Sequence, residues 1–295
     1  MKRDADTAVV APSLRIEPLT GAVGAEILGV DLAQDLPDET IAGIRRALAE
    51  HGVIFFREQQ LTPARQKAFA RRFGPIFVHP NFAATRPDLE IVEVVREPGD
   101  RRIVGEEWHT DTTMMASPPM GAVFYGVEVP PFGGDTLFAS QYLAYESLSS
   151  GMKAMLTGLK AVHSDRRVAG PAAVRDANEK RATQLKDDGT WRETSHAHPV
   201  VCVHPESGRK YLFVNRSYTI RFENMTEEES RPLLEFLFEQ GHRPEFTCRF
   251  RWQAGSVAFW DNRSTQHIAV HDAGTFRRVM RRVQVAGVPP QAATA

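Results

Sequence analysis

Short apolar segments separated by proline and glycine turns dominate the middle of this chain. They are interrupted by the pairs Pro118-Pro119, Pro130-Pro131 and Gly133-Gly134. Such pairs end strands, because proline cannot donate a ladder hydrogen bond and glycine readily adopts turn conformations. The resulting spacing is typical of an antiparallel β-sandwich and not of alternating β and α units. We therefore expect a mainly β protein.

Amphipathic segments with capping signals predict helices beside these strands. Asp38 and Gly52 mark the acidic first turn and the end of one such segment. Thr62, which is followed by proline, predicts the start of a second helix. Thr226 and Glu229 have the spacing of a capping box. The predicted helices cover residues 37–51, 62–72, 141–159 and 226–240.

One domain accounts for almost the whole sequence. Neither an internal repeat nor a linker-like stretch divides the 295 residues. Residues 1–13 are predicted to form a flexible tail, and residues 14–290 a single domain. Within that domain, residues 170–198 are polar, charged and aperiodic, which predicts a long loop that can act as a lid.

The charge balance argues against a function that depends on binding polyanions. Lys and Arg total 36 against 37 Asp and Glu, so the formal net charge is −1, whereas a nucleic-acid binder needs a basic excess. No apolar run is long enough to span a membrane, and the first residues lack the apolar core of a signal peptide. Cys202 and Cys248 lie far apart in strand-like segments, which argues against a disulfide framework. We expect a cytoplasmic homo-oligomer that binds neither nucleic acid nor membrane.

Two His-x-Asp triplets are candidate metal-binding elements, His109 with Asp111 and His163 with Asp165. Residues i and i+2 of a strand project from the same face, so an imidazole and a carboxylate can hold one ion together. Ten histidines produce such a triplet by chance with roughly even odds. His163 follows a predicted helix and enters a polar turn, which favours a structural role. His109 follows Trp108 in a strand-like segment and is the better candidate.

A third histidine and two arginines extend this candidate site near the C-terminus. His267 follows an apolar segment and a turn, which places it at the entrance to the final strand. Arg278 and Arg282 share one face of that strand. Guanidinium groups bind carboxylates through two parallel hydrogen bonds, so this face can clamp an anion; a solvated basic edge is the alternative. Two histidines and a carboxylate also suit the zinc of a hydrolase or a metal site without catalysis.

The order of these motifs resembles the taurine dioxygenase (TauD/TfdA) family of iron(II)- and 2-oxoglutarate-dependent oxygenases. Several ordered motifs at compatible spacing are much more specific than one triplet. The similarity extends over nearly the whole chain, through segments 19–32, 73–74, 108–113, 133–137, 211–215, 250–252 and 260–263, followed by His267, Arg278 and Arg282.

The resemblance implies a double-stranded β-helix, or jelly roll, which is mainly β with flanking helices (α+β). It implies that His109, Asp111 and His267 bind Fe(II), which leaves three octahedral positions for 2-oxoglutarate and O2. Thr136 and Arg278 would hold the distal carboxylate of 2-oxoglutarate. A halogenating relative would replace the carboxylate that Asp111 retains, so hydroxylation is favoured.

The same resemblance also indicates which residues would contact the substrate. Arg282 matches a family arginine near the cofactor and the substrate anion, His79 matches a histidine that contacts the sulfonate in taurine-type members, and Tyr218 matches an aromatic pocket position. Ala169 stands where taurine enzymes carry phenylalanine, and so small a residue would widen the pocket for a bulkier organic anion. Segment 105–108 is closer to aryloxyalkanoate relatives. We expect hydroxylation of a small organic anion, namely a sulfonate, sulfate ester or aryloxyalkanoate, with fragmentation of the product and release of succinate and CO2.

Overall fold

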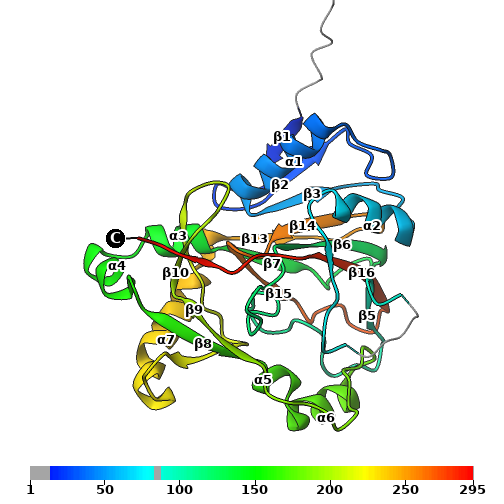
Figure 1. Cartoon of the computed structure of the whole chain (residues 1–295). Helices are drawn as coiled ribbons and strands as arrows, with labels where there is room; N and C mark the ends of the chain where they lie inside the picture. Colours follow the sequence, from blue (N-terminus) through cyan, green and yellow to red (C-terminus); the bar gives the residue numbers. More distant parts are fainter. Residues whose placement is uncertain (1–13, 83–87, 295) are drawn as a thin grey trace, which may run out of the picture.

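Two layers of antiparallel β-strands form the centre of the computed structural model, which describes residues 14–82 and 88–294 (Figure 1). Within these residues the larger layer is an eight-stranded sheet in the order β1-β2-β3-β14-β6-β16-β4, with β5 also paired to β16. Only β2 and β3 run parallel among its described pairs. The strands are β1 (Arg15–Pro18), β2 (Ala25–Leu28), β3 (Val53–Phe56), β4 (Ile76–Phe77), β5 (Val92–Arg96), β6 (Gly121–Glu128), β14 (Val257–Asp261) and β16 (Arg278–Val285).

The smaller layer packs against this sheet through an aromatic core. Its central strand β7 (Thr136–Ser140) pairs with β13 (Thr247–Phe250) and with β15 (Thr265–Ala269). Phe138 and Phe250 of this layer meet Phe55 of the larger sheet, and the rings of Phe55 and Phe250 stack with centroids 3.9 Å apart. Two sheets packed in this way make the jelly roll, so the predicted fold class is confirmed.

Helices α1 (Asp38–His51) and α2 (Pro63–Arg71) cover the opposite face of the larger sheet (Figure 1). Strand β3 shows how one segment serves both faces. Phe55 points into the core between the sheets, whereas Ile54 and Phe56 pack with the buried residues of α1 and α2. Successive side chains of a strand alternate between faces, which explains why all of β3 is apolar. The larger sheet is therefore held rigidly between two cores.

Two three-stranded sheets and further helices extend the jelly roll at one side. Helix α7 (Glu227–Gly241) begins at the predicted capping box of Thr226 and Glu229, which the structure confirms. It packs with α3 (Gln141–Glu146) and β12. The two additional sheets place β8 (Lys160–Ser164) between β12 (Thr219–Phe222) and β9 (Ser195–Pro199), and β10 (Val201–Val203) between β11 (Lys210–Leu212) and β17 (Gln291–Ala292).

Two segments differ from their sequence-based predictions. The helix predicted over residues 141–159 is two helices, α3 (Gln141–Glu146) and α4 (Ser150–Leu156), because the Ser149 hydroxyl caps a new helix by accepting from the Met152 N–H at 3.2 Å. The loop predicted over residues 170–198 contains α6 (Pro171–Lys180) and strand β9. Helix α6 forms because proline occupies its first turn and its apolar side chains are buried.

Smaller expectations had mixed outcomes. His163 was placed in a polar turn, which is wrong: it lies buried in β8, because both neighbouring strands pair across it. Cys202 and Cys248 are buried and form no disulfide. No helix in residues 14–82 or 88–294 is long and apolar enough to cross a membrane. The predicted tail at residues 1–13 lies outside the described residues.

Candidate functional site

Backbone pairing brings together two histidines that are far apart in the sequence. His109 lies in the segment before β6, and His267 lies inside β15 and not at the entrance to β16 as predicted. The His109 N–H donates to the His267 carbonyl at 3.1 Å, and the His267 N–H donates to the His109 carbonyl at 2.9 Å. Residues paired in this way lie opposite each other with side chains on the same face. Their ring centroids are consequently 4.1 Å apart.

Asp111 joins the two histidines to form a group that we call the triad. The Asp111 N–H donates to Oδ1 of Asn262 at 2.8 Å, and the Asn262 amide donates to the Asp111 carbonyl at 3.0 Å, which fixes this turn of the backbone. Oδ1 of Asp111 lies 3.6 Å from Nε2 of His109 and 4.0 Å from Nε2 of His267. One donor atom from each residue lies within 4.8 Å of the others. This donor set suits a divalent transition metal ion.

Charges around the triad favour the protonation states that bind metals. Burial alone would raise the pKa of Asp111, but Arg282 and the two histidines outweigh burial and lower it, so the carboxylate is ionised. Nη1 of Arg282 lies 3.1 Å from Oδ1 of Asp111. Burial and the neighbouring His109 lower the pKa of His267 well below its usual value. Nδ1 of His109 hydrogen-bonds the Glu107 carbonyl at 2.7 Å, which leaves Nε2 facing Asp111.

A buried polar network supports the backbone that follows Asp111. Oγ1 of Thr113 is hydrogen-bonded to Nδ1 of His163 at 2.8 Å and accepts from the Asn215 amide at 3.1 Å. Nε2 of His198 hydrogen-bonds the Thr113 carbonyl at 2.9 Å. His163 therefore has a structural role beside the triad. Sequence reasoning did not find this network, and its one available signal was the second His-x-Asp triplet.

Arg278 lines a separate cavity of about 20 Å³ near the triad. Its Nε and Nη2 atoms are buried and have no hydrogen-bond partner among the described residues, and burial lowers the pKa of the guanidinium to about 10. Trp252 lies beside both predicted cofactor residues: its ring is 5.7 Å from the Arg278 guanidinium, and its Nε1 donates to Oγ1 of Thr136 at 3.0 Å. The Thr136 hydroxyl hydrogen is thus left for another acceptor. Together these donors suit a carboxylate.

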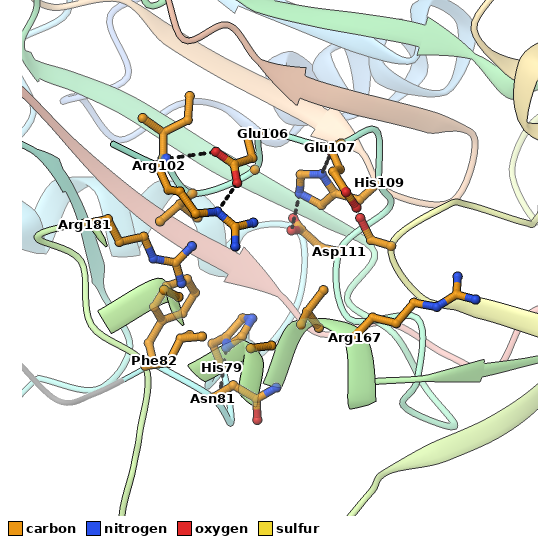
Figure 2. A pocket seen from close by; sticks show the side chains of 18 of the residues that line it. His79, Asn81, Phe82, Arg102, Glu106, Glu107, His109, Asp111, Arg167 and Arg181 are labelled. Carbon is orange, nitrogen blue, oxygen red and sulfur yellow. Dashed lines mark hydrogen bonds and ion pairs between the residues drawn. The ribbon is translucent and has the colours of Figure 1, made fainter. Parts of the chain in front are cut away.

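A larger cavity of about 170 Å³ opens beside the triad (Figure 2). Its lining includes His79, Tyr218 and Arg282, the residues predicted to contact the substrate. The Asn81 N–H donates to Nδ1 of His79 at 3.2 Å. Burial, with the nearby Arg282 charge, lowers the pKa of His79 to about 3, so the ring is neutral. Its proton therefore resides on Nε2, where it can be donated to an anion.

One wall of this cavity was not predicted from the sequence. Ala169 was expected to widen the pocket, but it is buried in helix α5 (Arg166–Ala169) and is not among the described lining residues; its neighbour Val168 lines the cavity instead. Arg102 and Glu106 line the cavity from the loop before the triad (Figure 2). Helix α6 and the residues after it contribute Ala173, Ala177, Arg181 and Leu185.

The sequence is similar to several characterised proteins over most of its length. It is 38% identical to an alkylsulfatase from Acinetobacter baylyi, with 93% of this chain and 85% of the relative covered. It is 36% identical to an alpha-ketoglutarate-dependent sulfate ester dioxygenase from Pseudomonas putida, with 96% and 93% covered. Both relatives therefore align with the whole jelly roll and not with a fragment of it.

Solved structures have the same architecture. A taurine dioxygenase from Burkholderia xenovorans superposes with a TM-score of 0.80 at 37% identity, covering 95% of this chain and 92% of that one. AAD-2 in complex with Mn(II) and N-oxalylglycine superposes with a TM-score of 0.78 at 25% identity, covering 95% and 100%.

The matches support oxygenase chemistry and not the zinc hydrolase or the non-catalytic metal site that the residues alone left open. The sequence also matches the family described as taurine catabolism dioxygenase TauD, TfdA family over residues 15–284. The chain is an oxidoreductase that uses Fe(II), 2-oxoglutarate and O2, and it belongs to this TauD/TfdA dioxygenase family.

Proposed function

We propose that this dioxygenase hydroxylates a small organic anion at the carbon next to a sulfate or sulfonate group or an ether oxygen, with the triad binding Fe(II). The observation that carries the proposal is that His109 and Asp111 of the triad line the same cavity as Arg282 and His79. When bound, Fe(II), 2-oxoglutarate and O2 supply the oxidising chemistry that hydroxylates a C–H bond and yields succinate and CO2. The protein residues bind and orient the reactants.

The triad fits a divalent iron ion on the chemistry of its donors. The ionised Asp111 carboxylate and the neutral His267 imidazole are in metal-binding forms. Oδ2 of Asp111 is buried and has no hydrogen-bond partner within the described part of the chain. Such an oxygen is costly to bury unless another group satisfies it, and a metal ion is one such group.

Arg278 and Thr136 are proposed to hold the distal carboxylate of 2-oxoglutarate. The two unpartnered donors of Arg278 match the two oxygens of a carboxylate, and the Thr136 hydroxyl adds a third hydrogen bond. A Cβ on Gly134 would lie 3.2 Å from Cδ of Arg278, so glycine allows the arginine to pack closely there. This close packing would hold the Arg278 side chain in place for the carboxylate.

Arg282, His79 and Tyr218 are proposed to contact the substrate anion. Arg282 is already paired with Asp111 through Nη1, whereas its Nε and Nη2 are buried without partners among the described residues. The neutral His79 can donate from Nε2. Burial raises the pKa of Tyr218, so its hydroxyl stays protonated and is a donor as well. These three residues line one cavity, and donors of this kind suit an oxyanion.

The similarities favour sulfate esters as the substrates, since an alkylsulfatase and a sulfate ester dioxygenase are among the most similar proteins. An alcohol formed on the carbon that bears the sulfate oxygen is unstable. The bond between that carbon and the ester oxygen breaks, the hydroxyl proton is lost, and an aldehyde and sulfate are produced. Hydroxylation therefore has the net result of ester cleavage without a hydrolytic water.

The proposal is tested by anaerobic addition of Fe(II) and 2-oxoglutarate to the purified protein. We expect a visible charge-transfer band between iron and the oxo-acid, and succinate formation when O2 and an alkyl sulfate are added. Asp111→Asn should abolish the band, whereas Asp165→Asn, in the second His-x-Asp triplet, should retain it. Correctly folded protein that shows no band would refute the proposal.

Three expectations extend beyond the site. We propose that the protein works in the cytoplasm as a homo-oligomer and that its substrate is a free small molecule, not a nucleic acid or a lipid surface. The net charge of −1 supports the last point. Light scattering of the purified protein would test the oligomeric state directly.

A further inference from the structure

We infer that Arg181 is a second anion-binding group of the large cavity, so that the preferred substrate carries an additional acidic group at the end remote from Arg282. The inference rests on the proposed function, in which Arg282 contacts the first anionic group. It specifies the substrate class: an apolar body with an anion at each end.

Arg181 faces the same cavity as the triad but lies apart from it. It follows α6, and it lines the cavity together with Asp111 and Arg282. Figure 2 shows Arg181 beside Phe82, away from His109 and Asp111. Phe82 also contacts the Arg282 guanidinium, which is 5.2 Å from its ring centroid. Phe82 therefore lines the cavity together with both arginines.

The Arg181 guanidinium is charged but is not neutralised by the protein. Among the described residues it forms no ion pair, and its one hydrogen bond runs from Nε to the Thr183 carbonyl at 3.0 Å. Arg102, by contrast, pairs with Glu106 and Asp176. The nearby Asp100 carboxylate accepts from the backbone N–H groups of Glu97 and Ala182 through its Oδ2 atom. Both Nη atoms of Arg181 are therefore left for a ligand.

The surroundings of Arg181 make an anionic ligand favourable. The side chain is half-buried, and burial together with the nearby Arg102 charge lowers the pKa of Arg181, although Glu106 and Asp100 act in the opposite direction. A carboxylate or sulfo group beside the guanidinium would offset both the cost of burying its charge and the repulsion from Arg102. The Nε hydrogen bond holds the side chain in place, because Thr183 is itself fixed by two hydrogen bonds with Val95 at 2.8 and 2.9 Å.

Apolar side chains form part of the wall of the cavity that Arg181 lines. They come from α5, from α6 and the segment after it, and from the loop before the triad, namely Ile103, Val104, Val168, Ala173, Ala177 and Leu185. An alkyl or aryl body would bury against these residues. A positively charged tail would instead be placed beside Arg181 and be repelled. The arrangement therefore selects by the charge of the tail as well as by its length.

The test compares three series of alkyl sulfates with matched chain lengths, which end in a carboxylate, a methyl group or an ammonium group. Binding to the protein loaded with Fe(II) and 2-oxoglutarate is measured anaerobically by calorimetry, and turnover is measured as succinate formation. For at least one chain length, the carboxylate series should bind on the order of tenfold to a hundredfold more tightly than the methyl series. The ammonium series should bind most weakly.

Variants assign the preference to Arg181. Arg181→Gln should remove the carboxylate preference and leave methyl-terminated sulfates unaffected, whereas Arg181→Lys should retain part of it. Arg175→Gln is the matched control, because Arg175 is an exposed arginine of α6 outside the cavity. Wild-type protein with no preference among the series would overturn the inference, as would a preference that survives in Arg181→Gln. Absence of turnover with intact binding would contradict the proposed function instead.

Discussion

Asp111 is the residue on which the charges of the site converge. Its carboxylate lies within 4.0 Å of both triad imidazoles and 3.1 Å from Arg282. Arg282 keeps the carboxylate ionised in a buried position, and the same residue lines the larger cavity. In the proposed site this one guanidinium would link metal binding to substrate binding, and its removal is expected to weaken both.

Arg278 is expected to control the affinity for 2-oxoglutarate and not that for iron. Arg278→Ala removes both unpartnered donors, so the concentration of 2-oxoglutarate that gives half of the charge-transfer band should rise on the order of tenfold to a hundredfold. Fe(II) content, measured after loading, should change little because Arg278 does not touch the triad. Arg278→Lys keeps the charge but loses the two parallel donors of the guanidinium, so it should retain part of the affinity. Unchanged dependence on 2-oxoglutarate would remove Arg278 from the cofactor site.

Gly105 is expected to position His109. Its φ is +78°, and a Cβ there would lie 3.1 Å from Cε1 of the His109 ring. Gly105→Ala should therefore displace the imidazole and lower Fe(II) affinity on the order of tenfold to a hundredfold in a metal titration. Gly189→Ala is the matched control, since Gly189 has a φ of +73° and no atom within 4 Å of its ideal Cβ. Equal metal affinity in the two variants would contradict this role.

At the scale of elements, α6 is attached to the loop before the triad by charged side chains. Asp176 pairs with Arg102 of that loop, and Lys180 pairs with the same carboxylate. The Arg101 N–H also donates to the Lys180 carbonyl at 2.8 Å. Figure 1 shows α5 and α6 at the end of the molecule opposite α1, away from the face of the larger sheet that α1 and α2 cover. The ion pairs therefore fix one wall of the cavity.

Asp176→Asn is expected to loosen α6 without unfolding the protein. The pairs are partly exposed, so the loss of global stability should be small. Hydrogen exchange across α6 should accelerate, and KM for the organic substrate should rise with little change in Fe(II) binding. Glu179→Gln is the control, because Glu179 lies on the same helix in an exposed pair with Arg101. The prediction fails if both variants exchange at the wild-type rate.

At the scale of the whole molecule, the site lies where the two sheets meet and draws on both. His267 and Thr136 belong to the smaller sheet, whereas Arg278 and Arg282 belong to β16 of the larger sheet. The larger sheet is packed on one face by α1 and α2 and on the other by the aromatic core. Groups mounted on strands buried in this way keep their separations, which is what a metal and cofactor site requires.

Buried histidines predict a dependence of global stability on pH. Burial lowers the pKa of His198 and of His242 to about 4, against an ordinary value of 6.5, and lowers that of His163 as well. Below pH 6.5 the unfolded chain therefore binds more protons than the folded one, so the free energy of unfolding falls as pH decreases from about 6.5 to 4. His198 alone contributes a loss of about 2 kcal/mol at pH 5.

Denaturant unfolding of the metal-free protein between pH 8 and pH 5, about the range in which histidine titrates, measures this effect. His198→Gln should flatten the pH dependence, whereas His196→Gln should not, because His196 is exposed on the same strand. An identical pH dependence in wild type and His198→Gln would show that His198 is not held neutral by the fold.

The sequence predicted elements well where local chemistry decides them. The capping box at Thr226 and the glycine after α1 depend only on neighbouring residues, and α7 begins and α1 ends there as expected. The helix predicted over residues 141–159 was too long, because Ser149 caps a new helix there and does not continue the first one. His163 was misplaced because its burial depends on two strands that approach from later in the chain. Helix α6 was missed because its apolar side is short.

The sequence by itself determined the mainly β fold with its flanking helices, and it identified the His109-x-Asp111 pair. Turn residues, caps and side-chain alternation are set by interactions between near neighbours, so they can be read from the order of residues. The tertiary structure alone decided that His109 faces His267, that Arg282 neutralises Asp111, and that Arg181 remains unpaired among the described residues. These relations depend on strand register and on packing between distant segments, which no local pattern specifies.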